Sequence, residues 1–225
     1  MQVSVVIPTL NEAATLGQML SLVRTAGECE LVVVDGGSRD DTLTIARLHA
    51  DLVLGASRGR ARQMNVGARA ATGEALLFLH ADSILPCQFP QQLQIAFADA
   101  AVVGGRFDVR LDAEGWQFRM IETLMNIRSR LSRISTGDQA IFVRRDVFHH
   151  LGGFPDLELM EDIEFSRRLK RAGKIACLRD RVTTSARRWR RDGVFRTIGL
   201  MWMLRLAYFL GVPPHQLKMF YADTR

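Results

Sequence analysis

The chain has 225 residues, of which 48% are hydrophobic and 24% are charged, a composition typical of a globular protein with a sizeable core. Its formal net charge is +6, and its three separated cysteines form no Cys-x-x-Cys pair, which argues against a disulfide framework and against a zinc site. The cysteine pattern favours a reducing compartment. The first residues lack the basic segment and long apolar run of a signal peptide, so we expect a cytoplasmic protein.

The first half of the chain alternates between apolar runs and amphipathic segments. Continuous apolar runs predict buried strands, and segments with helical spacing predict helices between them. The expected strands are 2–8, 29–35, 51–56 and 74–82, and the expected helices are 11–26, 40–50 and 60–71. This order predicts a mainly parallel α/β sheet, and such sheets bind ligands at the carboxyl ends of their strands.

The apolar run "ALLFLHAD" ends in His80 and Asp82. A carboxylate at the end of a buried strand needs a cation, a donor group or water. Asp82 could hold a divalent metal together with phosphate oxygens, and the alternative is an N-cap or an Asx turn. His80 by itself is more typical of a hydrogen-bonded histidine than of a metal ligand.

Two further acidic positions allow a chemical or a structural interpretation. Asp35 follows a strand in "VVVDGGSRDDT", where its carboxylate could accept from a base or a ribose hydroxyl, or could close a tight turn. Glu161 and Asp162 begin a predicted helix, where acids either complement the helix dipole or supply a general base.

The second half contains a predicted strand at 101–111, a helix at 116–133, a strand at 137–145 and a helix at 160–173. No linker separates it from the first half, so we expect one domain. It ends in an arginine cluster, five arginines within residues 185–196, and an apolar segment at 194–214.

The arginine cluster is either a solvated face or an anion site, because guanidinium groups match phosphate oxygens. A nucleic-acid partner is not expected, since the cluster lacks stacking aromatics and known motifs. Arg205 interrupts the apolar segment and Pro213 and Pro214 end it, so its uninterrupted apolar portions are too short to span a bilayer. It is a core or homodimer-interface helix, or alternatively a peripheral membrane helix.

Four ordered motifs resemble family 2 glycosyltransferases of the GT-A fold. They are "VSVVIPTLNEAATL", "ELVVVDGGSRDDT", "NVGARAATGEALLFLHAD" and "MEDIEFSRRLKRAG". The segments "FLHADSILP", "GDQAIFVRR" and "TSARRW" are similar to a bacterial subgroup described as radical-SAM/selenium-associated transferases. The resemblance implies one GT-A domain over 1–225, divided into a nucleotide-binding half (1–100), an acceptor-side half (101–180) and a basic and apolar helical tail (181–225).

The resemblance also implies a role for each matching position. Pro8, Glu12 and Asp35 match positions that hold the nucleoside. Arg60 or Arg62, with Asn65, matches the segment along the nucleotide. His80 and Asp82 occupy the ends of the metal-binding D-x-D motif, and Asp82 would bind Mn²⁺ or Mg²⁺. Asp162 matches the catalytic base, and Arg188 and Trp189 match the Q-x-x-R-W element. Because Asp162 takes the role of base, we assign Glu161 a supporting role in acceptor binding or orientation.

The sequence departs from the family pattern at three positions. His80 replaces the first acid of D-x-D, Gly36 replaces the second Asp of D-D-G-S, and Ser185 replaces the Gln of Q-x-x-R-W. The metal and the donor base therefore stay open.

We expect an inverting transferase that moves a sugar from a nucleotide-diphosphate donor to a hydroxyl acceptor. Among such donors, UDP-sugars are the first candidates. The alternatives are a sugar-nucleotide nucleotidyltransferase, whose glycine- and arginine-rich loop is absent, and a non-catalytic nucleotide-sugar-binding protein.

Overall fold

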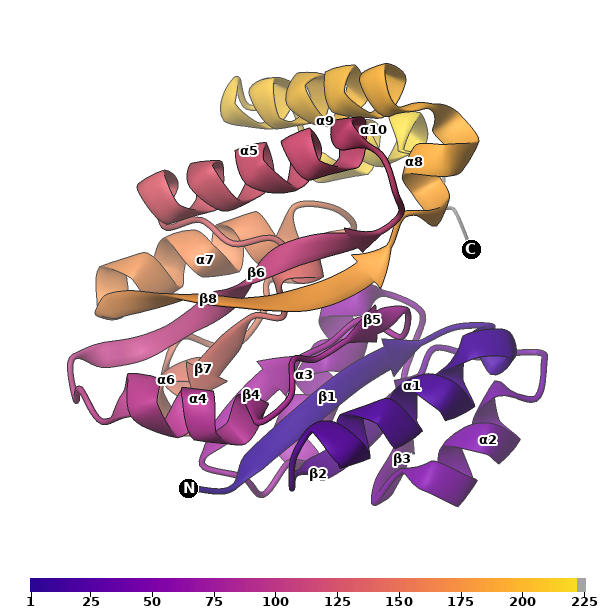
Figure 1. Cartoon of the computed structure of the whole chain (residues 1–225), viewed down its shortest axis with the longest axis vertical. Coiled ribbons are helices and arrows are strands. Elements are labelled where there is room, and N and C mark those ends of the chain that lie inside the picture. The colour runs from indigo at the N-terminus through magenta and orange to yellow at the C-terminus, as the bar shows by residue number, and fades with distance from the viewer. Residues whose placement is uncertain (222–225) are drawn as a thin grey trace.

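The computed structural model describes residues 1–221, which form one sheet in the order β3-β2-β1-β4-β7-β6-β8-β5 with helices around it (Figure 1). The strands are β1 Val3–Thr9, β2 Glu30–Asp35, β3 Leu52–Gly55, β4 Ala75–Phe78, β5 Ser83–Ile84, β6 Val102–Asp112, β7 Phe142–Arg144 and β8 Lys174–Ser185. The first four positions of the sheet pair in parallel, as do β6 and β8, whereas β7 and β5 are antiparallel to their neighbours. The fold is the expected α/β architecture with a mixed sheet.

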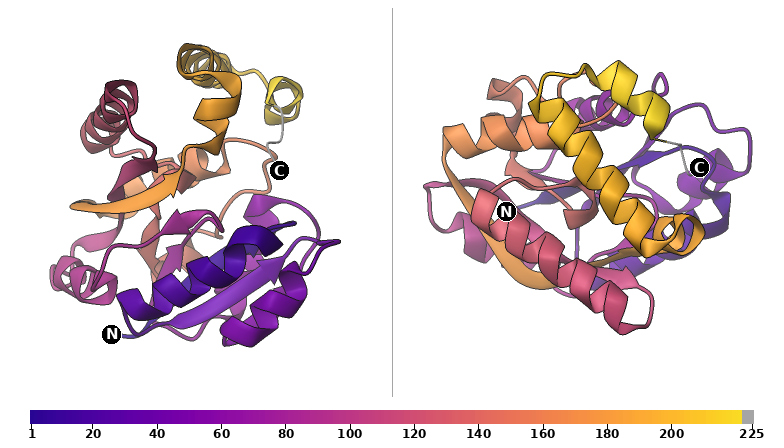
Figure 2. Two further views of the ribbon diagram at one scale, coloured as in Figure 1. Left: turned by 45° about the vertical axis from the view of Figure 1, so that its right-hand side comes forward. Right: turned by 90° about the horizontal axis from the view of Figure 1, so that it is seen from above.

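Helices cover both faces of the sheet, and those of the second half gather on one side of the molecule (Figure 2). They are α1 Ala13–Ala26, α2 Thr42–His49, α3 Arg60–Ala70, α4 Phe89–Phe97, α5 Trp116–Ser132, α6 Arg145–His150, α7 Glu161–Ala172, α8 Arg187–Asp192, α9 Val194–Phe209 and α10 Pro214–Phe220, with a short 3₁₀ helix η1 at Gly137–Gln139.

The apolar run of β1 is buried on both sides because successive side chains point to opposite faces. Val5 packs in the cluster that contains α1, and Val6 packs in the cluster that contains α3. Gly67 lets α3 approach the sheet, since a Cβ there would lie 2.4 Å from a methyl group of Val6. The strand ends of β1, β2 and β4 are thereby held side by side.

Two predicted strands change in the structure, and two elements appear that were not predicted. The predicted strand 74–82 ends at Phe78, so His80 and Asp82 lie in the following turn. The predicted strand 137–145 begins with η1, which a Thr136–Gln139 capping box stabilises, and only Phe142–Arg144 is extended. The long strand β8 and helix α4 were not predicted.

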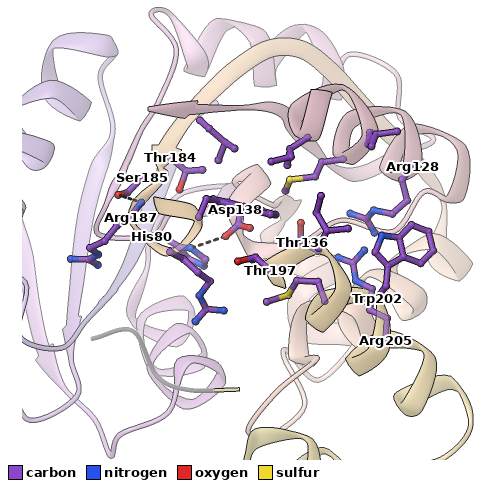
Figure 3. Close-up of a pocket in the computed structure, with 18 of the residues that line it drawn as sticks. His80, Arg128, Thr136, Asp138, Thr184, Ser185, Arg187, Thr197, Trp202 and Arg205 are labelled. Atoms are coloured by element: carbon purple, nitrogen blue, oxygen red, sulfur yellow. Dashed lines mark hydrogen bonds and ion pairs between the residues drawn. The ribbon is translucent and has the colours of Figure 1, made fainter. Parts of the chain in front are cut away.

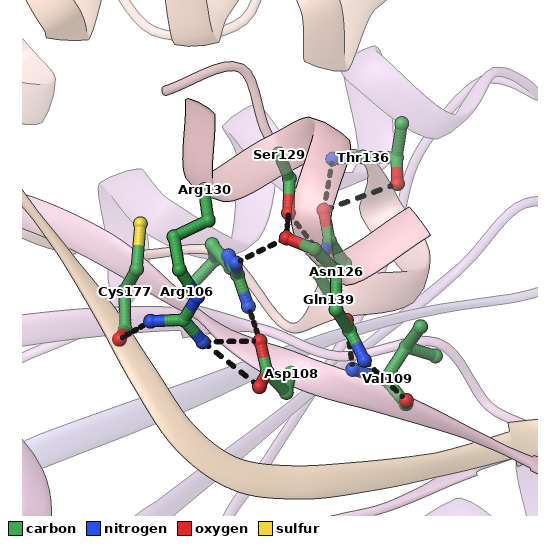
Figure 4. Close-up of polar contacts among 9 residues, drawn as sticks. All are labelled: Arg106, Asp108, Val109, Asn126, Ser129, Arg130, Thr136, Gln139 and Cys177. Carbon is green, nitrogen blue, oxygen red and sulfur yellow. Dashed lines mark hydrogen bonds and ion pairs between the residues drawn. The ribbon is translucent and has the colours of Figure 1, made fainter. Parts of the chain in front are cut away.

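A buried polar network fixes α5 against β6 (Figure 4). Arg106 is fully buried and pairs with Asp108, which also accepts from Arg130 Nη2 at 2.8 Å through both oxygens. The side chain of Asn126 bonds the backbone of Val109 in both directions, at 2.8 and 3.0 Å. These bonds replace strand-like pairing at this edge and determine where α5 presents its other side chains.

Helix α9 is not the core helix that its apolar sequence suggested. Only Thr197 and Leu204 are buried on it. Its large exposed apolar residues are Phe195, Trp202, Met203, Leu206 and Phe209. Within residues 1–221, no helix combines the length and the apolar character that a membrane crossing requires.

Candidate functional site

Two cavities lie along the edge where the first strands end. One, of about 360 Å³, is lined by Leu10, Asn11, Gly36, Gly37, Arg39 and Arg58. The other, of about 400 Å³, lies between the turn after β4, helices α5 and α9, and the start of α8 (Figure 3). A small third cavity adjoins it and contains Glu161 and Asp162. The parallel order of β2, β1 and β4 explains this convergence, as predicted for the strand ends.

The carboxylate of Asp35 accepts hydrogen bonds from its own loop, which follows β2. Asp35 accepts from the backbone N–H groups of Gly37 at 2.8 Å and of Ser38 at 2.9 Å, and from the Ser38 hydroxyl. The tight-turn interpretation thus describes Asp35 here. Pro8 is buried in β1 opposite Val34. Pro8 and Glu12 do not line the 360 Å³ cavity, and their contact with a nucleoside stays a prediction.

Helix α3 separates the three side chains that were predicted to follow the nucleotide. Arg60 lines the 400 Å³ cavity, with its Nη1 3.6 Å from Glu161 Oε1. Arg62 instead binds the exposed carboxylate of Asp156 at 2.8 Å. Asn65 both donates to and accepts from the backbone of Phe154, at 2.8 and 2.9 Å. Only Arg60 therefore reaches the cavity that contains the predicted metal ligand.

His80 and Asp82 both face the 400 Å³ cavity from the turn after β4. His80 is 8% exposed, and its Nδ1 lies 3.5 Å from Asp138 Oδ1 (Figure 3). Asp82 is more open, and its Oδ2 lies 3.9 Å from Nη2 of Arg187. Arg187 therefore provides a cation beside the predicted metal ligand, a contact that the sequence did not indicate.

Among the residues that the structure describes, the acids of this cavity do not form a complete metal site by themselves. Residues 1–221 contain no group of three or more His, Cys, Asp or Glu side chains that could hold an ion by themselves. Asp82 is a hard oxygen ligand open to the cavity, and Mg²⁺ commonly binds through one or two carboxylates plus substrate phosphates and water. The residues therefore fit an ion shared with a diphosphate, and not a preformed protein site.

Asp138 is a site residue that the sequence analysis did not identify. Its carboxylate opens onto the cavity, with 48% of the side chain exposed, yet the surrounding protein desolvates it and raises its pKa. Asp82 and Asp162 raise this pKa further, against the opposing effect of Arg60 and Arg188. Three carboxylates thus share one region, a pattern common at functional sites.

The strand-end rule overlooked Asp138 because it lies before a strand and not after one. Strand β7 is antiparallel to β4, with Phe142 paired to Leu77. The amino end of β7 therefore meets the carboxyl end of β4, and η1 carries Asp138 to the same edge as Asp82. An acid shortly before an expected strand was the available signal.

The two acids at the start of α7 have different surroundings. Asp162 accepts from the backbone N–H of Gly137 at 2.9 Å and of Ile163 at 2.7 Å. The Glu161 side chain is 5% exposed and faces Arg60. Asp162 is thereby held beside η1, whereas Glu161 is buried against a cation.

The arginine cluster divides into residues that face the cavity and residues that do not. Arg188 lines the cavity, with its guanidinium 3.9 Å from the ring centroid of Tyr221. Arg190 donates to the backbone of Asp112, and Arg191 pairs with Asp192, both on the exposed surface. Trp189 also lines the cavity and packs in the cluster of Leu111 and Phe118.

Comparison with protein families gives a match over residues 4–153 to the model described as Glycosyl transferase family 2. A PGL/p-HBAD biosynthesis glycosyltransferase of Mycobacterium bovis is 45% identical over 91 residues, 36% of each chain. Glycosyltransferase AglE of Haloferax volcanii is 29% identical over 189 residues, 76% of this chain and 62% of AglE. The aligned region thus spans about a third of the mycobacterial relative.

Two solved structures share the fold. S. aureus TarS 1–349 in complex with UDP-GlcNAc superposes with a TM-score of 0.67 at 22% identity, covering 82% of this chain and 58% of that one. GalNAc-T7 with UDP, GalNAc and Mn²⁺ gives a TM-score of 0.64 at 17% identity, covering 82% of this chain and 44% of that one. At these identities the likeness concerns the fold.

Proposed function

The chain belongs to glycosyl transferase family 2, and on that premise we propose that it transfers a sugar from a nucleotide-diphosphate donor to a hydroxyl acceptor with inversion. The observation that carries the proposal is the grouping of Asp82 and Asp138 around the 400 Å³ cavity with Asp162 in the small cavity that adjoins it. Arg60, Arg187 and Arg188 face or border the same carboxylates. Such a site offers a base for a hydroxyl and cations for a diphosphate leaving group.

A UDP-sugar is the donor that we propose. The 360 Å³ cavity lies beside Gly36 and Gly37. The space next to Gly37 is open to a ligand, since a Cβ built there would have no heavy atom within 4 Å. The diphosphate would then extend towards Asp82, across the carboxyl ends of β1 and β4. TarS, which shares the fold, was solved with UDP-GlcNAc. In this arrangement residues 1–100 form the half that binds the nucleotide, and residues 101–180 form the half on the acceptor side.

Asp82 would hold Mn²⁺ or Mg²⁺ together with the phosphate oxygens. When bound, the ion would neutralise charge that develops on the diphosphate. Arg187 and Arg188 would contribute further positive charge there, and His80 would orient Asp138 through their 3.5 Å contact.

Asp162 is the proposed base. The acceptor oxygen attacks C1 of the sugar from the face opposite the diphosphate, while its proton passes to a carboxylate oxygen of Asp162. The C1–O bond to the β-phosphate breaks, and the electron pair leaves with the nucleoside diphosphate. The Gly137 and Ile163 N–H bonds fix the carboxylate in one orientation, and Glu161 keeps Arg60 in place.

The exposed apolar surface of α9 suggests where the protein meets a larger partner. We retain two proposals for it, a peripheral contact with the inner face of the membrane and a homodimer through the C-terminal helices, for a protein located in the cytoplasm. Flotation with anionic vesicles and sedimentation of the protein alone distinguish them.

The test of the proposed function is incubation with a panel of nucleotide sugars, with and without Mn²⁺. The expected result is release of a nucleoside diphosphate that depends on Asp162. The anomeric configuration of the product, measured by NMR, should be opposite to that of the donor. Retention of configuration, or release of pyrophosphate instead, contradicts the proposal.

A further inference from the structure

Within residues 1–221, two arginines of the 400 Å³ cavity have no acid at salt-bridge distance. Arg128 projects from α5 and Arg205 from α9, and the two side chains lie together at the end of the cavity away from His80 (Figure 3). The Nη2 atom of Arg128 is buried without a hydrogen-bond acceptor among residues 1–221. Across the same residues, neither side chain forms a salt bridge. A buried donor left unsatisfied calls for a ligand or for water.

The two charges also destabilise each other. Burial, followed by repulsion from Arg205, lowers the pKa of Arg128 to about 10. Burial likewise lowers the pKa of Arg205. Asp138 and Asp162 oppose both shifts without cancelling them. Two guanidinium groups held in this way form a site that an anion would stabilise.

The fold fixes the part of α5 that carries Arg128. Arg128 lies between Asn126 and Arg130, whose bonds to β6, Asp108 and the backbone of Cys177 fix this turn of α5 (Figure 4). Arg205 follows Leu204, which is fully buried. Both guanidinium groups are therefore carried by anchored helices.

The pair lies on the acceptor side of the site. The end of the cavity near Asp82 has its own cations, Arg60, Arg187 and Arg188. The acids that attract Arg128 and Arg205 are Asp138 and the proposed base Asp162. The assignment to the acceptor rests on the proposed function, in which the acceptor hydroxyl meets Asp162.

The wall next to the pair is apolar. It consists of side chains from α5 and α9, namely Ile121, Leu124, Met125, Ile198, Met201 and Trp202. Trp202 is 67% exposed and Leu124 is 56% exposed, so this wall continues to the surface of the molecule. A ligand that satisfied the whole region would combine an anionic group with an apolar body.

We propose that Arg128 and Arg205 bind an oxyanion, such as a phosphate, carried by an amphiphilic acceptor whose apolar body lies between α5 and α9. The acceptor is then neither a free sugar nor a neutral lipid. Charge complementarity selects the anionic group, and the exposed apolar wall selects the remainder.

The test is calorimetric titration of the full chain with octyl phosphate, octyl glucoside and inorganic phosphate. Octyl phosphate should bind at least about tenfold more tightly than either of the other two, because only it satisfies both the arginines and the apolar wall. Equal affinity of octyl phosphate and inorganic phosphate indicates a free-phosphate site, and equal affinity of octyl phosphate and octyl glucoside indicates an apolar groove alone. Either result overturns the proposal.

Variants locate the binding. Arg128→Gln and Arg205→Gln should each weaken octyl phosphate by about tenfold. Arg196→Gln removes a charge from an exposed position on α9 and should leave the affinity unchanged. Trp202→Ala should weaken octyl phosphate and leave inorganic phosphate unchanged. Arg128→Lys keeps the charge but loses the fork, so it should fall between wild type and Arg128→Gln and serves as the second variant if the latter fails to fold.

Affinity for UDP in the same variants separates this inference from the proposed function. UDP should bind the Arg128 and Arg205 variants as it binds the wild type. A parallel loss of UDP and octyl phosphate would assign the pair to the donor and overturn the inference. If the wild type binds octyl phosphate through these arginines but neither binds UDP nor hydrolyses nucleotide sugars, the anion site stands and the proposed function fails.

Discussion

The carboxylate of Asp162 accepts a hydrogen bond from the backbone N–H of Gly137 at 2.9 Å, which ties the first turn of α7 to the residue before Asp138. The bond links two segments that are separated by a long stretch of chain. It holds the proposed base Asp162 next to Asp138, the carboxylate whose pKa is raised. Asp138 in turn contacts His80, so the bond also connects α7 to the turn after β4.

Replacing Asp162 by Asn should lower turnover by about 10²–10⁴-fold and leave UDP affinity nearly unchanged, because the amide cannot take the proton. The amide oxygen accepts from only one of the two N–H groups, so a modest fall in melting temperature is also expected. Steady-state kinetics and UDP titration measure the two effects. A normal Asp162→Asn enzyme beside an inactive Glu161→Gln enzyme would reverse the two roles, and full activity in both would contradict the inverting mechanism.

Asp82→Ala should abolish the contribution of a divalent ion to nucleotide binding. The measurement compares the dissociation constant of UDP in Mn²⁺ and in EDTA, for this variant and for Asp146→Ala, an exposed acid on α6. Wild type and Asp146→Ala should bind more tightly in Mn²⁺, since the ion bridges a carboxylate and the phosphates. Identical wild-type affinity in Mn²⁺ and EDTA would show that the cations of the site are its arginines.

Asp138→Asn should raise the melting temperature by a few degrees at pH 7–8. The raised pKa of Asp138 means that the folded state holds its proton more tightly than the unfolded state, so ionisation costs stability as the pH rises through the folded pKa. The advantage of Asn should vanish below about pH 4, where the carboxyl is protonated in both states. Thermal denaturation between pH 3 and pH 8 gives the profile, and a constant difference across this range would reject the cause.

Arg188→Ala should weaken UDP binding by about tenfold, whereas Arg191→Ala should leave it within about twofold. Arg188 faces the cavity and Arg191 pairs with Asp192 on the surface, where such pairs contribute little. Titration of both variants with UDP makes the comparison. Equal losses would mean that the cluster acts through its total charge and not through one position.

Asp108→Asn should lower the free energy of unfolding by about 3 kcal/mol, since it leaves the fully buried Arg106 without its counter-ion. Arg110→Gln on the same strand is exposed and should change little. Urea denaturation measures both. Arg106 also donates to the backbone carbonyl of Asn126 at 3.1 Å. A stability near that of the wild type for Asp108→Asn would show that this bond is sufficient to hold Arg106.

The sequence by itself determined strands β1 to β4 and the helices between them, and it indicated Asp82 and Asp162 as candidate site acids. Local periodicity predicts buried strands and covering helices, and the carboxyl ends of neighbouring parallel strands meet at one edge. That reasoning placed His80 and Asp82 beside a ligand cavity, and the family motif selected Asp162. Each inference depends on residues close together in the chain or on a motif of fixed spacing.

The tertiary structure alone decided which remote side chains meet. Arg60 and Arg62 share a motif, but successive residues turn by about 100° around a helix, so only Arg60 faces the cavity. Asp138 reaches the site because β7 runs antiparallel to β4, and Arg187 reaches Asp82 because α8 follows β8 to the same edge. Arg128 and Arg205 lie together because α5 and α9 border the same cavity. No local sequence pattern records this, because it depends on how whole elements are arranged.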